Sequence, residues 1–449
     1  MPEAGTLASL IANSASAERF VSTRDYIVPL NRVAENSPFG AHRSALAGRS
    51  VVLFVRDMAK AAAALIDLDG VAQRILLCPP AWDDAKLASA ARSIGADALA
   101  FDEEEPRTDL PVALRYPVRL PLCACEAAGP TLETEWVLPT SGTMGPPKLA
   151  VHTLRTLMGA IVPVPVQQWA TFYDIRRYGG LQIFLRALAG SGSLQLSGVD
   201  EDMESFLARC GARGVTHISG TPTHWRMALF SGAASSVDPD TVRLSGETAD
   251  DPLLARLSSA YPRAQIEHAY ASTEAGVVFE VGDGRAGFPA AWLDREGPIA
   301  LKIREGSLRV RTPRRALRLL GANAPALVDE TGFLDTDDLI ETRGDRCHFM
   351  GRRGGIINVG GAKVHPEEIE AVLNDLDLVR ASRVFARSNP IMGAIVVAEI
   401  VLNDPSAKHA NLEREIMTAA RLRLAPHMTP AQIRFVAELP TTDAGKLRR

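Results

Sequence analysis

Short apolar runs alternate with helical patterns between residues 50 and 140, and this alternation is the strongest constraint on the fold. The strand-like runs are SVVLFV (50–55), RILLCPP (74–80) and ADALAF (96–101), and the helical ones are DMAKAAAALIDL (57–68) and WDDAKLASAARSIG (82–95). Strands that alternate with helices in this way form parallel sheets whose faces the helices cover. The chain is therefore predicted to have an α/β fold whose large N-terminal part is built from layered subdomains.

The same rhythm continues after residue 150 and then changes. Helical patterns cover HTLRTLMGAIV (152–162), EDMESFLARCGARG (201–214) and DPLLARLSSAYP (251–262), and strand-like runs are GSLQL (192–196), VTHISG (215–220) and AQIEHAYA (264–271). Residues 297–350 consist instead of short alternating segments such as ALKIREGSLRVRTP. Such alternation is typical of an antiparallel sheet with one covered face.

The stretch GRRGG at 351–355 is the best candidate for a domain boundary, because glycines and arginines interrupt the pattern there. We expect an N-terminal domain at 1–350, a hinge at 351–355 and a small, mobile α+β domain at 356–449. That domain begins with a predicted hairpin, IINVGGAKV, followed by the helix PEEIEAVLNDL. Pro366 stands at the first position of the helix with acidic residues behind it, which is a strong start signal.

Composition narrows the classes of function. The 449 residues carry a net charge of -4, so no basic surplus points to nucleic acid or to a membrane surface. The first twenty residues lack the basic and apolar regions of a secretory signal, and no apolar run is long enough to span a bilayer. Five scattered cysteines without a C-x-x-C pair are typical of reduced thiols. A cytoplasmic protein is expected.

The loop PTSGTMGPPK at 139–148 has the equipment to hold phosphate. Glycines let backbone amides approach an anion, hydroxyl groups add donors, and Lys148 supplies a charge. The segment EWVLPTSGTMGPPKLAVHTLRTLMGAIV indicates a strand, this loop and then a helix. A Walker A loop requires G-x-x-x-x-G-K-[ST], and the spacing here does not fit it, since Leu149 stands where the hydroxyl residue should be. A Gly-Pro turn that caps a helix remains an alternative for the loop alone.

Together with five later motifs, this loop resembles that of the adenylate-forming superfamily, which includes acyl-CoA and aryl-CoA synthetases, peptide-synthetase adenylation domains and luciferase. In chain order, the further motifs are SGE (245–247), AYASTEAG (269–276), TGFLDTDDL (331–339), GRRGGIINVGGAKVHPEEIE (351–370) and PTTDAGKLRR (440–449). The resemblance covers roughly residues 135–449. It implies that a carboxylate attacks the α-phosphate of ATP and pyrophosphate leaves, after which the acyl group passes to a thiol.

The resemblance also assigns roles to residues in the nucleotide site. Those expected to hold the leaving phosphates are Thr140, Ser141, Gly142, Thr143, Gly145 and Lys148. Gly246 and Glu247 would line the adenine pocket and Tyr270 would stack on adenine, with a core aromatic as the alternative for Tyr270. Thr273 is expected to reach the α-phosphate, and Glu274 to bind Mg²⁺, a cation that prefers carboxylate and phosphate oxygens.

Asp338 is expected to accept hydrogen bonds from the ribose hydroxyls, with Arg352 beside it. Its neighbours Asp335 and Asp337 are interpreted instead as a solvated acidic turn. Asp337 stands where the family has glycine, so it is in doubt whether the backbone there takes the family's conformation.

Lys446 matches the family's catalytic lysine, which contacts the acyl carboxylate and the α-phosphate. Lysine is rare in this chain, and two of its seven lysines, Lys148 and Lys446, fall on motif positions. In the family the small domain swings between one orientation that inserts this lysine and another that presents the hairpin to a thiol. Such a swing needs a residue that absorbs a large dihedral change, and Gly354 is the candidate.

The acid is expected to bind between residues 172–184, residues 219–229 and the strand of Tyr270, where aromatic and small residues suit an apolar or aromatic acid. Asp174 is interpreted as a surface or helix-capping residue rather than as the partner of an amino group. The thiol could belong to coenzyme A or to the phosphopantetheine of an acyl carrier protein. An ATP-binding protein or ATPase that never forms an adenylate is the alternative from a different class; it would yield ADP or nothing in place of AMP and pyrophosphate.

Overall fold

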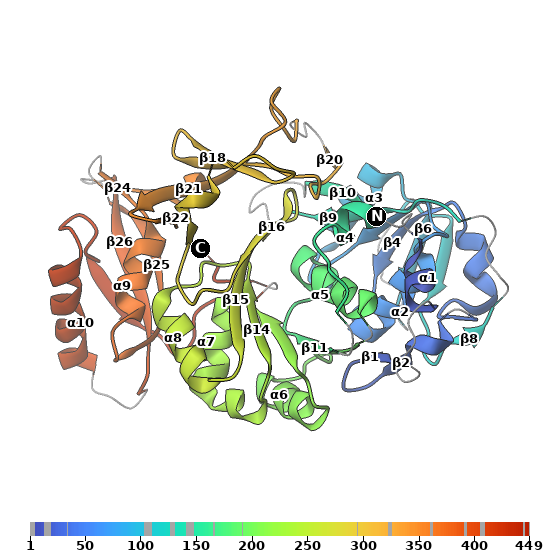
Figure 1. Ribbon diagram of the computed structural model, residues 1–449, viewed down its shortest axis with the longest axis horizontal. Coiled ribbons are helices and arrows are strands. Elements are labelled where there is room, and N and C mark those ends of the chain that lie inside the picture. Colours follow the sequence, from blue (N-terminus) through green and yellow to red (C-terminus); the bar gives the residue numbers. More distant parts are fainter. Residues whose placement is uncertain are drawn as a thin grey trace.

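The protein is represented by a computed structural model (Figure 1), in which two large mixed sheets and a smaller antiparallel sheet lie next to a separate C-terminal unit. The structure describes residues 5–12, 19–33, 35–102, 110–125, 131–140, 148–164, 167–190, 192–293, 295–321, 326–359, 362–389, 393–404, 409–442 and 445–448. Within these ranges, no helix is both long and apolar enough to cross a membrane.

The first sheet confirms the strand–helix alternation expected near the N-terminus. Its strand order is β20 (Arg318–Leu320), β10 (Leu149–Thr153), β9 (Glu135–Pro139), β5 (Arg74–Leu77), β4 (Ser50–Phe54), β6 (Ala98–Phe101) and β7 (Leu114–Pro117). Helices α2 (Met58–Leu68) and α3 (Asp84–Ile94) connect β4, β5 and β6, which pair in parallel. Asp57 caps α2 by accepting hydrogen bonds from two backbone amides of its first turn. Gly95 ends α3 in the left-handed conformation.

The helix expected over 152–162 is confirmed only over Leu154–Met158 and is wrong at both ends. We call the loop at 139–148 the phosphate-type loop. After it the chain forms β10, which runs antiparallel to β9, and the helix α4 covers Leu154–Met158 alone. All five residues of β10 are buried and pair with β9, and the first three also pair with β20 on the other side. Burial between two strands outweighs the helical spacing of the sequence. The strand β9 is thus followed in the chain by a second strand that pairs with it, and not directly by a helix.

The second sheet confirms the continuation of the pattern after residue 150. Its order is β16 (Gly276–Val281), β15 (Gln265–Ser272), β14 (Thr241–Ser245), β13 (His217–Gly220), β11 (Gln168–Thr171), β12 (Ser193–Leu196), β1 (Phe20–Ser22) and β2 (Ile27–Pro29). Its helices are α5 (Tyr178–Ala189), α6 (Met203–Ala212), α7 (Pro222–Ser231) and α8 (Asp251–Ala260). The strands β11 to β15 pair in parallel, so their carboxyl ends meet at one edge. A short helix, α1 (Leu7–Ala12), and the small pair β3 (Asn36–Ser37) and β8 (Cys123–Ala124) complete this part.

The antiparallel sheet expected within 297–350 is present, in the order β17 (Phe288–Pro289), β22 (Arg346–Arg352), β21 (Leu334–Arg343), β19 (Ser307–Arg311) and β18 (Ala300–Arg304). Asp335 and Asp337, expected in a solvated acidic turn, lie within β21, although Asp337 is exposed as expected. Asp335 is paired with Arg309 at 2.9 Å. Asp337 has φ of +59°, so it adopts the left-handed conformation that a glycine would take.

The C-terminal unit has its own apolar core and the expected α+β composition. Its elements are β23 (Ile357–Val359), β24 (Ala362–Val364), α9 (Pro366–Asn374), β25 (Val379–Asn389), β26 (Gly393–Leu402), α10 (His409–Arg423) and β27 (Gln432–Phe435). A short 3₁₀ helix at Arg353–Gly355 separates β22 from β23. The chain then returns to the second sheet, where Gly445 and Leu447 contact Thr221 and Glu247, which follow β13 and β14. The domain limits and the hinge remain predictions.

Candidate functional site

The last residues of the chain dock at the carboxyl edge of the second sheet. The hydroxyl of Thr221 donates to the carbonyl of Gly445 at 2.9 Å, across 224 positions of sequence. Gly445 has φ of +65°, and a β-carbon there would clash with the ring of His224. A glycine is therefore required where the tail crosses α7.

Glu247 fixes the tail from the other side. Its carboxylate accepts one hydrogen bond from the amide of Leu447 at 2.8 Å and another from the amide of Thr223 at 3.0 Å. Thr223 belongs to the first turn of α7, where unpaired amides favour a carboxylate. Glu247, expected to line the adenine pocket, thus also connects a helix start to the tail.

Lys446 lies between these two anchors and points at Gly246. A β-carbon added at Gly246 would stand 2.9 Å from Cε and 3.4 Å from Nζ of Lys446, and Gly246 has φ of +88°. Burial lowers the pKa of Lys446, while the carboxylates of Glu247 and Asp338 act to raise it. The ammonium is thus held in a largely enclosed space beside the SGE motif, although only three residues of the sequence follow it.

Asp338 faces the same space. Its Oδ2 accepts a hydrogen bond from the hydroxyl of Tyr270 at 2.5 Å, and its Oδ1 lies 3.3 Å from Nε of Arg352. Asp338 in β21 pairs with Arg352 in β22, and Tyr270 belongs to β15. Three of the sequence motifs therefore meet at this point. Burial raises the pKa of Asp338, and the hydrogen bond from Tyr270 and the charge of Arg352 counteract that rise. Because a carboxylate accepts about four hydrogen bonds, acceptor capacity for ribose hydroxyls remains.

Tyr270 belongs to a cluster of aromatic rings. Its ring lies 5.3 Å from that of Phe279 and 4.9 Å from that of Phe349, and both are inclined to it by 24°. The side chain is nevertheless half-buried rather than enclosed. Both interpretations, an adenine platform and a core aromatic at a strand end, therefore still apply to Tyr270.

The hairpin β9–β10 holds the base of the phosphate-type loop. The amide of Thr140 donates to the carbonyl of Lys148 at 2.9 Å, so the two residues face each other where the loop begins and ends. Lys148 is exposed. Ser141, Gly142, Thr143 and Gly145 lie outside the described residues.

A buried histidine connects this hairpin to the turn that carries Thr273 and Glu274. Nε2 of His152, in β10, lies 2.7 Å from the carbonyl oxygen of Thr273, and Nδ1 lies 2.9 Å from the hydroxyl of Thr156. Burial lowers the pKa of His152 to about 4, so the ring is neutral at pH 7. Because a carbonyl only accepts, Nε2 carries the proton.

Glu274 presents the donor chemistry expected of a magnesium ligand. Its side chain is half-buried, and no hydrogen bond or ion pair to its carboxylate occurs among the described residues. In the same part of the chain, no three His, Cys, Asp or Glu side chains gather into a metal site. Mg²⁺ would therefore need phosphate oxygens in addition to Glu274, as is usual for this cation.

Sequence reasoning missed several residues that build the site. His152, Thr221 and His224 act through contacts with segments more than 100 positions away, and no local pattern signals such contacts. Residues 219–229, expected to line the acid pocket, contribute Thr221 and His224 to the binding of the tail. The surface or capping role expected for Asp174 is wrong, because it pairs with the buried Arg176 at 2.6 Å.

Two family models match the chain. The model described as "AMP-binding enzyme" matches residues 72–303, and the one described as "AMP-binding enzyme C-terminal domain" matches residues 368–446. The motifs SGE (245–247) and AYASTEAG (269–276) lie within the first match, and Lys446 is the last residue of the second match.

Curated relatives and solved structures agree with these matches. The chain is 25% identical to acyl-coenzyme A synthetase ACSM4, mitochondrial, of Rattus norvegicus over 351 residues, which cover 69% of this chain and 59% of the relative. It is 36% identical to ACSM5, mitochondrial, of Homo sapiens over 166 residues, 35% and 29% of the two chains. The chain thus spans less than two thirds of the length of these relatives.

Two solved structures share the fold over nearly their whole length. The anthranilate CoA ligase AuaEII in complex with anthranoyl-AMP has a TM-score of 0.81 at 17% identity, with 100% of this chain and 96% of that chain covered. A benzoate CoA ligase from Burkholderia xenovorans LB400 has a TM-score of 0.80 at 17% identity, with 99% of both chains covered.

Proposed function

The chain belongs to the AMP-binding enzyme family, and from this premise we propose that it activates a small carboxylic acid with ATP and transfers the acyl group to a thiol. In the first step a carboxylate oxygen bonds to the α-phosphorus while the bond to the pyrophosphate oxygen breaks. In the second step the sulfur of the thiol attacks the acyl carbon, and AMP leaves.

The docked Lys446 is the observation that carries the proposal. A buried ammonium is costly unless a partner compensates for the lost hydration. Here it lies against Gly246 in a space bordered by Glu247, Asp338 and Arg352. A cation so placed offsets the charge that builds up when a carboxylate approaches a phosphate. Hydrogen bonds at both neighbouring residues hold it in place, so little reorganisation is needed at the moment of reaction.

The remaining roles are those that the family resemblance assigns to the other residues. Thr140 and Lys148 would bind the leaving phosphates, together with Ser141, Gly142, Thr143 and Gly145. Glu274 would hold Mg²⁺, which supplies neutralisation of phosphate charge when bound. Asp338, with Arg352 and Tyr270, would bind the ribose and the adenine.

Coenzyme A is the acceptor that we favour, because the curated relatives ACSM4 and ACSM5 are named acyl-coenzyme A synthetases. The phosphopantetheine of a carrier protein remains the alternative acceptor. The acid is proposed to be apolar or aromatic; the neighbours AuaEII and the benzoate ligase are named for aromatic acids. A cytoplasmic location stays a prediction.

A screen of acids tests the proposal directly. Fatty, aromatic and amino acids are incubated with ATP, Mg²⁺ and hydroxylamine, which traps an acyl-adenylate as a hydroxamate. AMP and pyrophosphate are expected for at least one acid, together with exchange of labelled pyrophosphate into ATP. Release of ADP and phosphate with no hydroxamate for any acid would identify an ATPase instead.

His152 is expected to position Thr273 for adenylation. His152→Phe keeps an aromatic ring beside Tyr178 but removes both nitrogens, so the carbonyl of Thr273 loses its donor. We expect kcat of pyrophosphate exchange to fall about tenfold, on the scale of one buried hydrogen bond, with a smaller change in KM for ATP. His152→Gln, which retains an N–H donor, should restore most of kcat. Equal rates in the Phe variant and the wild type, at equal thermal stability, would contradict this role.

The pH dependence of adenylation is expected to report Lys446. Because burial lowers its pKa, the cation is lost as pH rises through a value below the ordinary lysine pKa of about 10.4. kcat/KM for ATP, which reports the free enzyme, should therefore fall on the alkaline side below that pH. Lys446→Arg should be slower but flat in the same range, because a guanidinium stays charged. An identical alkaline limb in both proteins would exclude Lys446 as its origin.

A further inference from the structure

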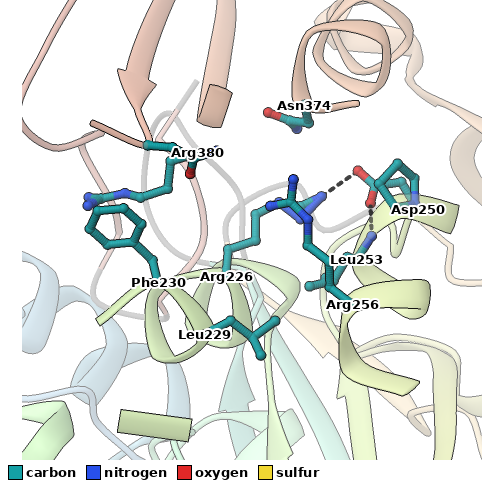
Figure 2. A pocket seen from close by; sticks show the side chains of 10 residues that line it. Arg226, Leu229, Phe230, Asp250, Leu253, Arg256, Asn374 and Arg380 are labelled. Atoms are coloured by element: carbon teal, nitrogen blue, oxygen red, sulfur yellow. Dashed lines mark hydrogen bonds and ion pairs between the residues drawn. The ribbon is translucent and has the colours of Figure 1, made fainter. Parts of the chain in front are cut away.

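A cavity of about 340 Å³ lies where the second sheet's helices meet the C-terminal unit. Among the described residues it is lined by Arg226, Leu229, Phe230, Asp250, Pro252, Leu253, Arg256, Asn374, Arg380 and Asn403, and we call it the arginine cavity. Figure 2 shows one wall formed by α7 and α8 and the opposite wall formed by the C-terminal unit. It shares no lining residue with the nucleotide site.

The charges around the arginine cavity do not balance. Three guanidinium groups face one carboxylate, that of Asp250, in the part of the lining that the structure describes. Asp250 is already bound, because it forms an ion pair with Arg226 and caps α8 through the amide of Leu253. Arg256 has no hydrogen bond or ion pair among the described residues. The described lining therefore carries a surplus of two positive charges, and from outside it the carboxylate of Glu438 acts on Arg380.

Arg380 is the charged residue that the C-terminal unit contributes to the arginine cavity. Its guanidinium lies 3.8 Å from the centre of the Phe230 ring, so α7 and β25 contact each other across the rim of the cavity (Figure 2). Stacking on a ring leaves the N–H groups at the edge of a guanidinium available to an oxyanion. The carboxamides of Asn374 and Asn403 add polar groups on the same wall.

We propose that the arginine cavity binds a phosphate-bearing small molecule. A phosphate monoester carries about two negative charges at pH 7, which matches the surplus, whereas a monocarboxylate would offset half of it. Guanidinium groups bind phosphate oxygens in pairs, and the volume falls in the range of sites for small ligands. Leu229 and Leu253 provide apolar surface for the carbon part of such a ligand.

Binding at the arginine cavity has a conformational consequence. Its two walls belong to parts of the chain that the proposed hinge connects, so the complete cavity exists in the orientation in which Lys446 is docked. A ligand that needs both walls favours this orientation by its difference in affinity between the two orientations. Resting on the proposed function, this consequence predicts that the ligand slows thioester formation more than adenylate formation.

Titration calorimetry on the full chain tests the site without any acid or ATP. The probes are glycerol 3-phosphate, succinate and acetate, and the protein carries Lys148→Gln so that the phosphate-type loop does not contribute. We expect binding of glycerol 3-phosphate, weakened about tenfold or more by Arg256→Gln and further by Arg256→Gln with Arg380→Gln. Arg263→Gln is the matched control, since it removes an exposed arginine paired with Asp238 outside the cavity lining, and it should bind as before.

The outcomes separate this inference from the proposed function. Equal binding by the unmodified cavity and by Arg256→Gln would overturn the site, and so would absence of binding. Succinate or acetate bound as tightly as glycerol 3-phosphate would overturn the assignment to phosphate. Because Arg256 is exposed, its replacement is not expected to disturb folding. Phosphate binding at the cavity, combined with no adenylating activity of the wild-type chain for any acid, would uphold the site while refuting the proposed function.

Discussion

Replacing Lys446 with alanine is expected to lower the rate of adenylate formation by about 10² or more, the scale of losing one preorganised donor to a transition state. Deletion of the ammonium leaves the space beside Gly246 without its cation, while Glu247 and Asp338 keep their negative charges. Those carboxylates would then repel the attacking carboxylate and the phosphates. The loss should appear mainly in kcat of pyrophosphate exchange, because the charge develops in the transition state.

Two comparisons make this result specific. Lys86→Ala removes an exposed lysine of α3 that pairs with Asp83, and adenylation should be unchanged. The second step should be spared in Lys446→Ala when a chemically prepared acyl-adenylate is supplied with the thiol, because the lysine then has no phosphate to stabilise. Adenylation at the wild-type rate in Lys446→Ala would remove the central support of the proposal.

The fold was predictable wherever burial and local pattern agreed. The strands at 50–54, 74–77 and 98–101 are continuous apolar runs because helices cover both faces of a parallel sheet. The prediction failed at LAVHT, where a helical spacing follows directly and the pairing with β9 and β20 decides the structure. That pairing joins residues up to 171 positions apart, such as Leu149 and Leu320, and no window of sequence contains it.

In the candidate site, too, residues with a local sequence signal were predicted and residues that act through long-range contacts were not. Residues inside motifs, such as Lys446 and Asp338, were found because their neighbours in sequence carry the resemblance. Thr221 and His152 were missed because each acts through one long-range hydrogen bond. Asp337 illustrates the converse: its departure from glycine raised a doubt about the backbone, yet the left-handed conformation is retained, which aspartate tolerates better than most residues.

Gly354→Pro is expected to leave adenylate formation within about threefold of the wild type and to reduce thioester formation about tenfold or more, because proline fixes φ near −65°. Gly354 lies in the 3₁₀ helix Arg353–Gly355, a type of helix that has φ of about −50° to −70°, and a β-carbon at Gly354 meets nothing within 4 Å. The orientation with Lys446 docked therefore accommodates the ring. A swing of the C-terminal unit needs a different φ at the hinge, and proline denies it.

Single-turnover assays separate the two steps. Pyrophosphate release measures adenylation, and mass spectrometry of the coenzyme A thioester measures transfer. Gly354→Ala is the matched control, because alanine adds a β-carbon without fixing φ, and both steps should stay close to the wild type. Equal loss of both steps in Gly354→Pro would show that the substitution damages the docked state, and an unimpaired second step would show that the swing pivots elsewhere, for example at Gly351, whose φ is +104°.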